Sequence, residues 1–148
     1  MLDFLRTLLE GPPAAAPIDA RRAVAALLVE AAATDAPVDT DERDVIERFL
    51  REMFGVSPFE AATLRAEGEA AQAEAADVVR FTRVVKADLS EAERGVLLEA
   101  LWSVVFSDGK RDPHEDALLR KLAPLIAVTD HDSAAARRRV TARLGLTD

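Results

Sequence analysis

An acidic loop flanked by apolar helical stretches occurs twice in this chain of 148 residues, and this repetition constrains the fold more than any other feature. Each copy carries the pattern D-x-x-x-D-x-x-E. A shift of 73 residues superposes the two acidic sets, which are Asp35, Asp39 and Glu42 in the first copy and Asp108, Asp112 and Glu115 in the second. The same shift aligns apolar positions, such as Leu28 with Leu101 and Phe49 with Leu122. We therefore infer an internal duplication.

The stretches between these loops predict an all-α fold. Apolar residues recur three or four positions apart, alanine is abundant and tyrosine is absent, which favours helices over strands. Ser90 with Glu93 forms a capping-box pattern, and Gly55 is a helix stop signal. We expect a bundle of about seven to eight helices, built from two pseudo-symmetric helix–acidic loop–helix repeats. One helix is predicted over 76–86, and Gly68 is expected to weaken another.

The first 16 residues are predicted to stand apart from the rest. Their apolar residues share roughly one helical face, and a Pro/Ala-rich stretch then breaks the pattern. This predicts a short N-terminal helix and linker over 1–16, followed by a single domain over 17–148. The short helix either packs back on the domain, frays, docks a partner or touches a membrane surface, and it is too short to hold a membrane alone.

Charge and composition exclude several classes of protein. The net charge of −8 argues against a nucleic-acid binder, which needs Lys and Arg to neutralise phosphates, and leaves cations or basic protein surfaces as partners. The absence of Cys excludes disulfides and thiolate metal sites. No apolar run approaches the roughly 20 residues that span a bilayer, and the first residues lack a signal-peptide pattern. We expect a cytoplasmic protein that does not insert into membranes.

The acidic loops allow two interpretations. In the structural one, Asp39 and Asp112 cap the helices that follow, and Glu42 and Glu115 complete capping boxes. In the functional one, all six carboxylates, Asp35, Asp39, Glu42, Asp108, Asp112 and Glu115, are candidate ligands of a hard cation such as Ca²⁺, Mg²⁺ or Mn²⁺. The loops are too short for an EF-hand, and Zn²⁺ through His114 is less favoured. Asp35 and Asp108 matter most, because capping explains them least.

Enzyme signatures are missing from the sequence. It has no phosphate-binding glycine loop and no Cys-His or Ser-His constellation, so we expect a protein that is not an enzyme. A hydrolase that used the carboxylates would need a metal or a buried acid in an enclosed cleft. Trp102 is expected in the core. The arginines at 137–139 and Arg143 either dock an acidic partner or lipid, or form a solvated helix face.

The loops and their surroundings resemble the tellurite-resistance protein B (TerB-like) family. Matching residues are Leu27-Leu28-Val29-Glu30-Ala31 with the first acidic set, Arg80-Phe81-Thr82-Arg83-Val84, Glu91-Ala92-Glu93-Arg94, and Ser107-Asp108-Gly109 with Asp112 and Glu115. The chain looks closest to the small, stand-alone bacterial branch. The resemblance implies a helical cytoplasmic domain that binds or senses metal ions and docks to membrane-associated stress-response complexes. The chain departs from the family pattern at Ala36 and at Lys110-Arg111.

The sequence thus favours a non-enzymatic TerB-like module that binds divalent cations through two acidic loops and docks a protein partner. The alternative is a structural helical adaptor or homodimer, whose acidic residues only cap helices. Cation dependence of the fold separates these two hypotheses.

Overall fold

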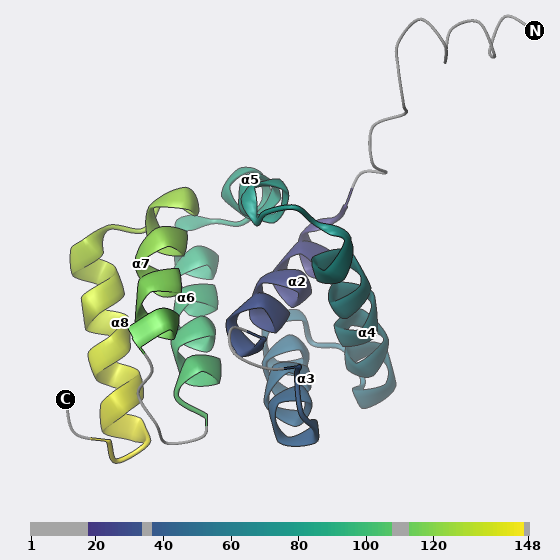
Figure 1. Cartoon of the computed structure of the whole chain (residues 1–148), viewed down its shortest axis with the longest axis horizontal. Helices are drawn as coiled ribbons and strands as arrows, with labels where there is room; N and C mark the ends of the chain where they lie inside the picture. The colour runs from purple at the N-terminus through teal and green to yellow at the C-terminus, as the bar shows by residue number, and fades with distance from the viewer. Residues whose placement is uncertain (1–17, 34–36, 108–112, 147–148) are drawn as a thin grey trace, which may run out of the picture.

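The computed structural model describes residues 18–33, 37–107 and 113–146, and within them the chain forms seven α-helices and no strand (Figure 1). The helices are α2 (Ala20–Ala32), α3 (Thr40–Phe54), α4 (Pro58–Glu74), α5 (Val79–Asp88), α6 (Glu91–Val105), α7 (Pro113–Leu125) and α8 (Asp130–Arg143). The predicted all-α bundle is confirmed. The predicted segment 1–16 and the loop residues Asp35, Asp108 and Asp112 lie outside the described residues.

Local signals in the sequence set most helix ends. Gly55 ends α3 in the left-handed conformation with φ of 63°, which a residue without a Cβ adopts at little cost. The Ser57 side chain accepts a hydrogen bond from the Glu60 backbone N–H, and Pro58 occupies the first turn of α4. The predicted start of α5 at 76 was wrong, since the helix begins at Val79. The carboxylate of Asp77 accepts the Val79 N–H at 2.9 Å, a local bond that competes with helical pairing.

The helices form two groups of three, α2–α4 and α6–α8, with α5 joining them along the upper edge in Figure 1. In the first group α2 packs mainly on α4, and in the second α6 packs mainly on α8. The shift of 73 residues carries the start of α3 at Thr40 onto the start of α7 at Pro113. The helix bounds agree with the proposed duplication, which itself remains an inference from the sequence.

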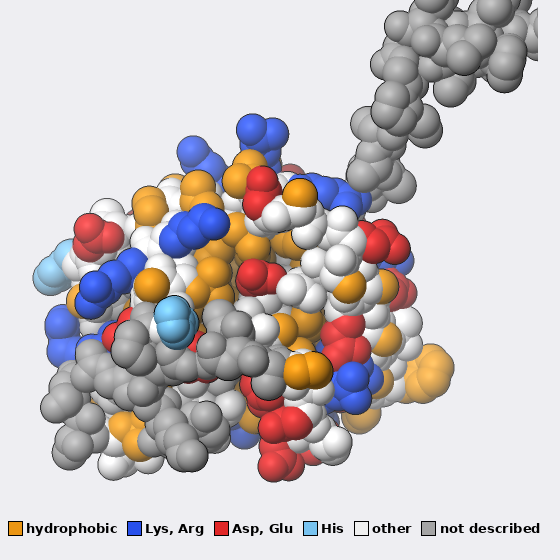
Figure 2. Space-filling model, in the orientation of Figure 1, with side chains coloured by type: hydrophobic (Ala, Val, Ile, Leu, Met, Phe, Trp, Pro, Cys, Tyr) orange, Lys and Arg blue, Asp and Glu red, His pale blue; other side chains and the backbone are white. Residues whose placement is uncertain are grey.

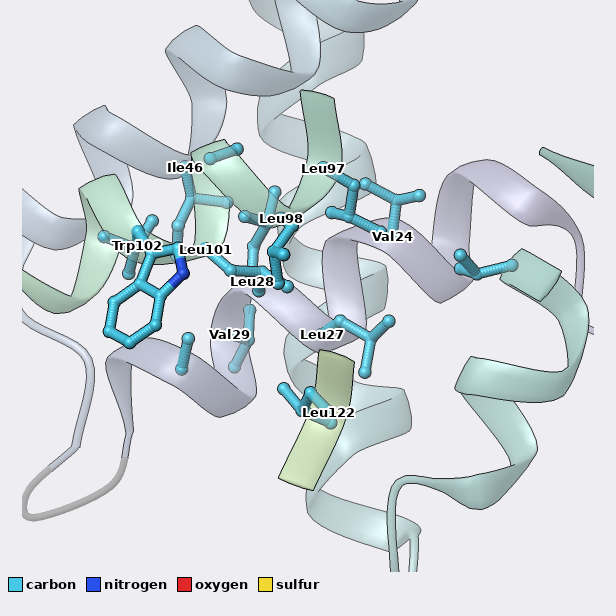
Figure 3. Packing of buried hydrophobic residues seen from close by; sticks show 14 of the residues in the cluster. Val24, Leu27, Leu28, Val29, Ile46, Leu97, Leu98, Leu101, Trp102 and Leu122 are labelled. Carbon is cyan, nitrogen blue, oxygen red and sulfur yellow. The ribbon is translucent and has the colours of Figure 1, made fainter. Parts of the chain in front are cut away.

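The core lies where α2 meets the second group of helices. Apolar side chains of α2 and α6 face each other there, with contributions from α3 and α7 (Figure 3). The fully buried residues at this junction include Val24, Leu27, Leu28, Ile46, Leu97, Leu98, Leu101 and Leu122. Full burial of one such side chain contributes about 1.5–3 kcal/mol. The apolar side chains of α2 therefore belong to the core of the first group and also pack against the second group, and in this way they hold the two groups together.

The close contact of α4 with α2 depends on Gly68. A Cβ at this position would lie 2.7 Å from Ala25 Cβ and 2.8 Å from the Ala25 carbonyl carbon, closer than real atoms pack. The expectation that Gly68 only weakens α4 is therefore incomplete. Its missing side chain allows the two helix backbones to approach, and that contact offsets the lower helix propensity of glycine.

Candidate functional site

The described part of the first acidic loop leads into α3 through a capping box. The Asp39 carboxylate accepts the Glu42 N–H at 2.8 Å, and the Glu42 carboxylate accepts the Asp39 N–H at 3.1 Å. Two backbone donors at the start of the helix are thereby satisfied, and both negative charges lie at the positive end of the helix dipole. The capping role predicted for Asp39 and Glu42 is confirmed.

The described part of the second loop begins at the first turn of α7. Glu115 is half-buried there, next to His114, which is exposed. A negative side chain in the first turn of a helix favours the dipole, as in the first copy. Asp112, the predicted cap of α7, lies outside the described residues, so the second capping box stays a prediction.

The helix ends that border the two loops lie on the same side of the molecule. Figure 1 shows the C-terminal ends of α2 and α6 and the N-terminal ends of α3 and α7 directed toward the lower edge. Among the described residues, however, no group of three or more His, Asp or Glu side chains could hold a metal ion. Asp39, Glu42 and Glu115 do not make a site by themselves. A cation site would also need the carboxylates at 35, 108 and 112.

A partly buried ion pair connects α7 to α8 beside the single tryptophan. Arg137 Nη2 lies 3.8 Å from Asp116 Oδ2, with only 18% and 13% of the two side chains exposed. The same guanidinium lies 5.7 Å from the Trp102 ring centroid and 5.8 Å from that of Phe106. The two rings stack on each other, with centroids 5.7 Å apart. Through this arrangement Arg137 connects α8 with α7 by an ion pair and with the aromatic rings beside it by cation–π contacts.

The arginines of α8 therefore have different environments. Arg137 is packed against aromatic rings, so it does not belong to a solvated face. Arg139 and Arg143 both pair with Glu99 of α6, at 3.4 Å and 2.8 Å. Sequence reasoning missed Asp116 because it stands one position after the repeated acidic pattern. The only sequence signal for the cluster is the spacing of Trp102 and Phe106, which places both rings on one face of α6.

Charges elsewhere on the described surface are mixed. In Figure 2, acidic and basic side chains are interspersed, and no broad basic patch faces the viewer. The capping box of α6 repeats the design of α3, with the Ser90 N–H donating to the Glu93 carboxylate at 2.9 Å. This hydrogen bond, with one from the Ser90 side chain, lowers the pKa of Glu93.

Comparison with known proteins adds one finding. A family model described as "Tellurite resistance protein TerB" matches residues 21–138, which is most of the chain and includes both acidic loops. Searches of curated proteins and of solved structures gave no match. In the described part of the chain, no helix has the length and apolar character needed to cross a membrane.

Proposed function

The chain belongs to the tellurite resistance protein TerB family, and we propose that it is a non-enzymatic module that binds a divalent cation through its acidic loops and docks a protein partner. The observation that carries the proposal is the placement of the helix ends on either side of the two acidic loops. The four helix ends that border them are directed toward one side of the molecule (Figure 1). A cation bound there would be linked to helices of both groups, and its binding would therefore bear on the surface between them.

The chemistry of the loops favours a hard cation. Each loop supplies two Asp and one Glu, and the chain has no Cys. Carboxylate oxygens are the ligands that Ca²⁺, Mg²⁺ and Mn²⁺ prefer, whereas Zn²⁺ favours His and Cys. Asp35 and Asp108 follow the C-terminal ends of α2 and α6, where a negative charge is unfavourable for the helix dipole. A bound cation gives these two carboxylates a role that capping does not.

The capping box of α3 favours a second candidate function. Because Asp39 and Glu42 already bond backbone donors, they do not require a cation to explain their presence. In that case the chain is a helical adaptor, or a homodimer, whose acidic residues only cap helices. A hydrolase has less support. Asp116, with 13% of its side chain exposed, is paired with Arg137 of α8, and this pairing gives the carboxylate a structural role.

The test is thermal unfolding of the wild type and of Asp35→Asn/Asp108→Asn, with Ca²⁺, Mg²⁺, Mn²⁺ or Zn²⁺ and with chelator. A ligand that binds only the folded state contributes about 2.7 kcal/mol at a hundredfold excess over Kd. For this chain length, where 1 kcal/mol shifts Tm by about 2–4 °C, we expect one cation to raise the Tm of the wild type by about 5–11 °C. The double variant should show no such rise.

A matched control removes two carboxylates away from the loops. Glu74→Gln/Glu91→Gln has the same change in net charge, and both side chains are exposed. It should retain the cation-dependent rise in Tm. If neither the wild type nor this control responds to any cation, the acidic residues act as caps and the adaptor function replaces the proposal.

A further inference from the structure

A groove with a cavity volume of about 550 Å³ lies between α3, the end of α6 and the end of α8. Its walls come from both groups of helices. The lining residues are Val45, Arg48, Phe49, Glu52, Ser103, Ser107, Arg143 and Leu144. The groove also adjoins both loops in sequence, because α3 begins directly after the first loop and Ser107 is the last described residue before the second. A structural change in either loop would therefore alter the shape of this groove.

The apolar part of the groove is the edge of the apolar face of α3. Ile46 and Leu50 of this face are fully buried in the core. Val45 and Phe49, spaced by one helical turn, pack against the same core but are only half-buried, and both line the groove. Leu144, on the opposite wall, is 45% exposed. Apolar surface on both walls of the groove is therefore accessible to a binding partner.

Two arginines hold defined positions on facing walls of this groove. Arg143 donates hydrogen bonds to Glu99 and to the Ser103 hydroxyl, each at 2.8 Å. The Arg48 guanidinium lies 5.4 Å from the Phe49 ring centroid. Glu52 is the single acidic side chain among the described lining residues, and Glu99 pairs with Arg143 from beside the groove. An apolar floor between two arginines is complementary to apolar side chains that are accompanied by carboxylates.

We propose that this groove docks an acidic amphipathic helix of a protein partner. The helix places its apolar side chains on Val45, Phe49 and Leu144, and its carboxylates meet Arg48 and Arg143. The inference builds on the partner docking of the proposed function and specifies its surface. It is independent of whether the loops hold a cation.

The experiment measures binding of a fluorescein-labelled peptide of Leu, Glu and Ala to the full chain by fluorescence anisotropy. A length of about 18 residues supports an isolated helix, with Leu at i, i+3, i+4 and i+7. We expect saturable binding. Arg48→Glu/Arg143→Glu should weaken it about tenfold or more, because the carboxylates then face like charges. A peptide with Lys in place of Glu should also bind at least about tenfold more weakly to the wild type, and this comparison requires no variant.

The control variant is Arg83→Glu/Lys86→Glu, which makes the same change in net charge at exposed positions of α5. Equal weakening by this control would show a non-specific charge effect and would overturn the groove assignment, as would the absence of saturable binding. Leu144→Asp should weaken peptide binding as well, whereas the control variant should retain it. A concentration-dependent dimer that Leu144→Asp dissociates would instead assign the groove to a second copy of the chain.

The two proposals fail separately. Peptide binding is measured with chelator and with Ca²⁺, and the groove variant is also tested for the cation-dependent rise in Tm. Loss of peptide binding with an intact rise in Tm contradicts only the groove. Intact peptide binding without any rise in Tm contradicts only the cation site.

Discussion

Gly68 of α4 packs directly against Ala25 of α2, and a single substitution tests this contact. Gly68→Ala would improve the helix propensity of α4 by about 1 kcal/mol, but its Cβ would lie 2.7 Å from Ala25 Cβ. Because the nearest atoms include backbone, relief requires the helices to separate. We expect a net loss of about 1–3 kcal/mol in the free energy of unfolding, measured by urea denaturation.

Gly95 of α6 provides the matched control. A Cβ built there meets no atom within 4 Å, so Gly95→Ala should gain about 0.5–1 kcal/mol from helix propensity alone. Equal stabilisation by both substitutions would mean that the helices of the first group adapt without cost, and would contradict the packing role of Gly68.

At the scale of single residues, the sequence predicts roles that depend on neighbours in the chain and misses those that depend on distant ones. Asp39 caps α3 through Glu42, three positions away, and the pattern shows it. Asp116 and Arg137 meet only because α7 and α8 pack side by side. A charged residue gives no sign in the sequence of being paired across helices. The ion pair was therefore not predicted.

At the scale of helices, the capping box of α6 makes a pH-dependent contribution to stability. The hydrogen bonds from Ser90 lower the pKa of Glu93 from its ordinary value of 4.5. A carboxyl whose pKa is lower in the folded state stabilises the fold above the unfolded pKa, and this stabilisation is lost as pH falls through the folded pKa. Glu93→Gln should thus be less stable than the wild type at neutral pH, and the difference should shrink progressively below pH 4.5.

Urea denaturation at several pH values measures this difference, and Glu91→Gln serves as its control. Glu91 lies in the same turn of α6 but is not part of the capping box. Its variant should follow the wild-type pH dependence more closely than Glu93→Gln does. A constant difference between Glu93→Gln and the wild type down to acidic pH would contradict the capping contribution.

The helices themselves were predictable because their signals are local. Caps at Ser57 and Ser90 and the glycine stop at Gly55 lie within one turn of the helix ends that they set. The start of α5 also depends on a local interaction, but one that the apolar pattern does not reveal. The Asp77 carboxylate accepts a hydrogen bond from the Val79 N–H, and the helix begins only there. The groove between α3, α6 and α8 was not predictable, because no local pattern specifies how three distant helices meet.

At the scale of the whole molecule, the position of α2 predicts cooperative unfolding. Leu27 and Leu28 are fully buried and belong to the core that joins both groups of helices (Figure 3). Neither group keeps its core if the other unfolds. Far-UV circular dichroism, which reports all helices, and tryptophan emission should therefore show the same midpoint in urea. Separate midpoints would mean that the two groups unfold independently.

The stacking of Trp102 on Phe106 under Arg137 has a practical consequence. The chain has one Trp and no Tyr, so emission excited at wavelengths that only the indole absorbs originates from a single position in α6. That position lies within the second group of helices and contacts the side chain that pairs with α7. Tryptophan fluorescence thus acts as a label-free optical probe of this half of the molecule, while events confined to the first half leave the emission unchanged unless α2 transmits them.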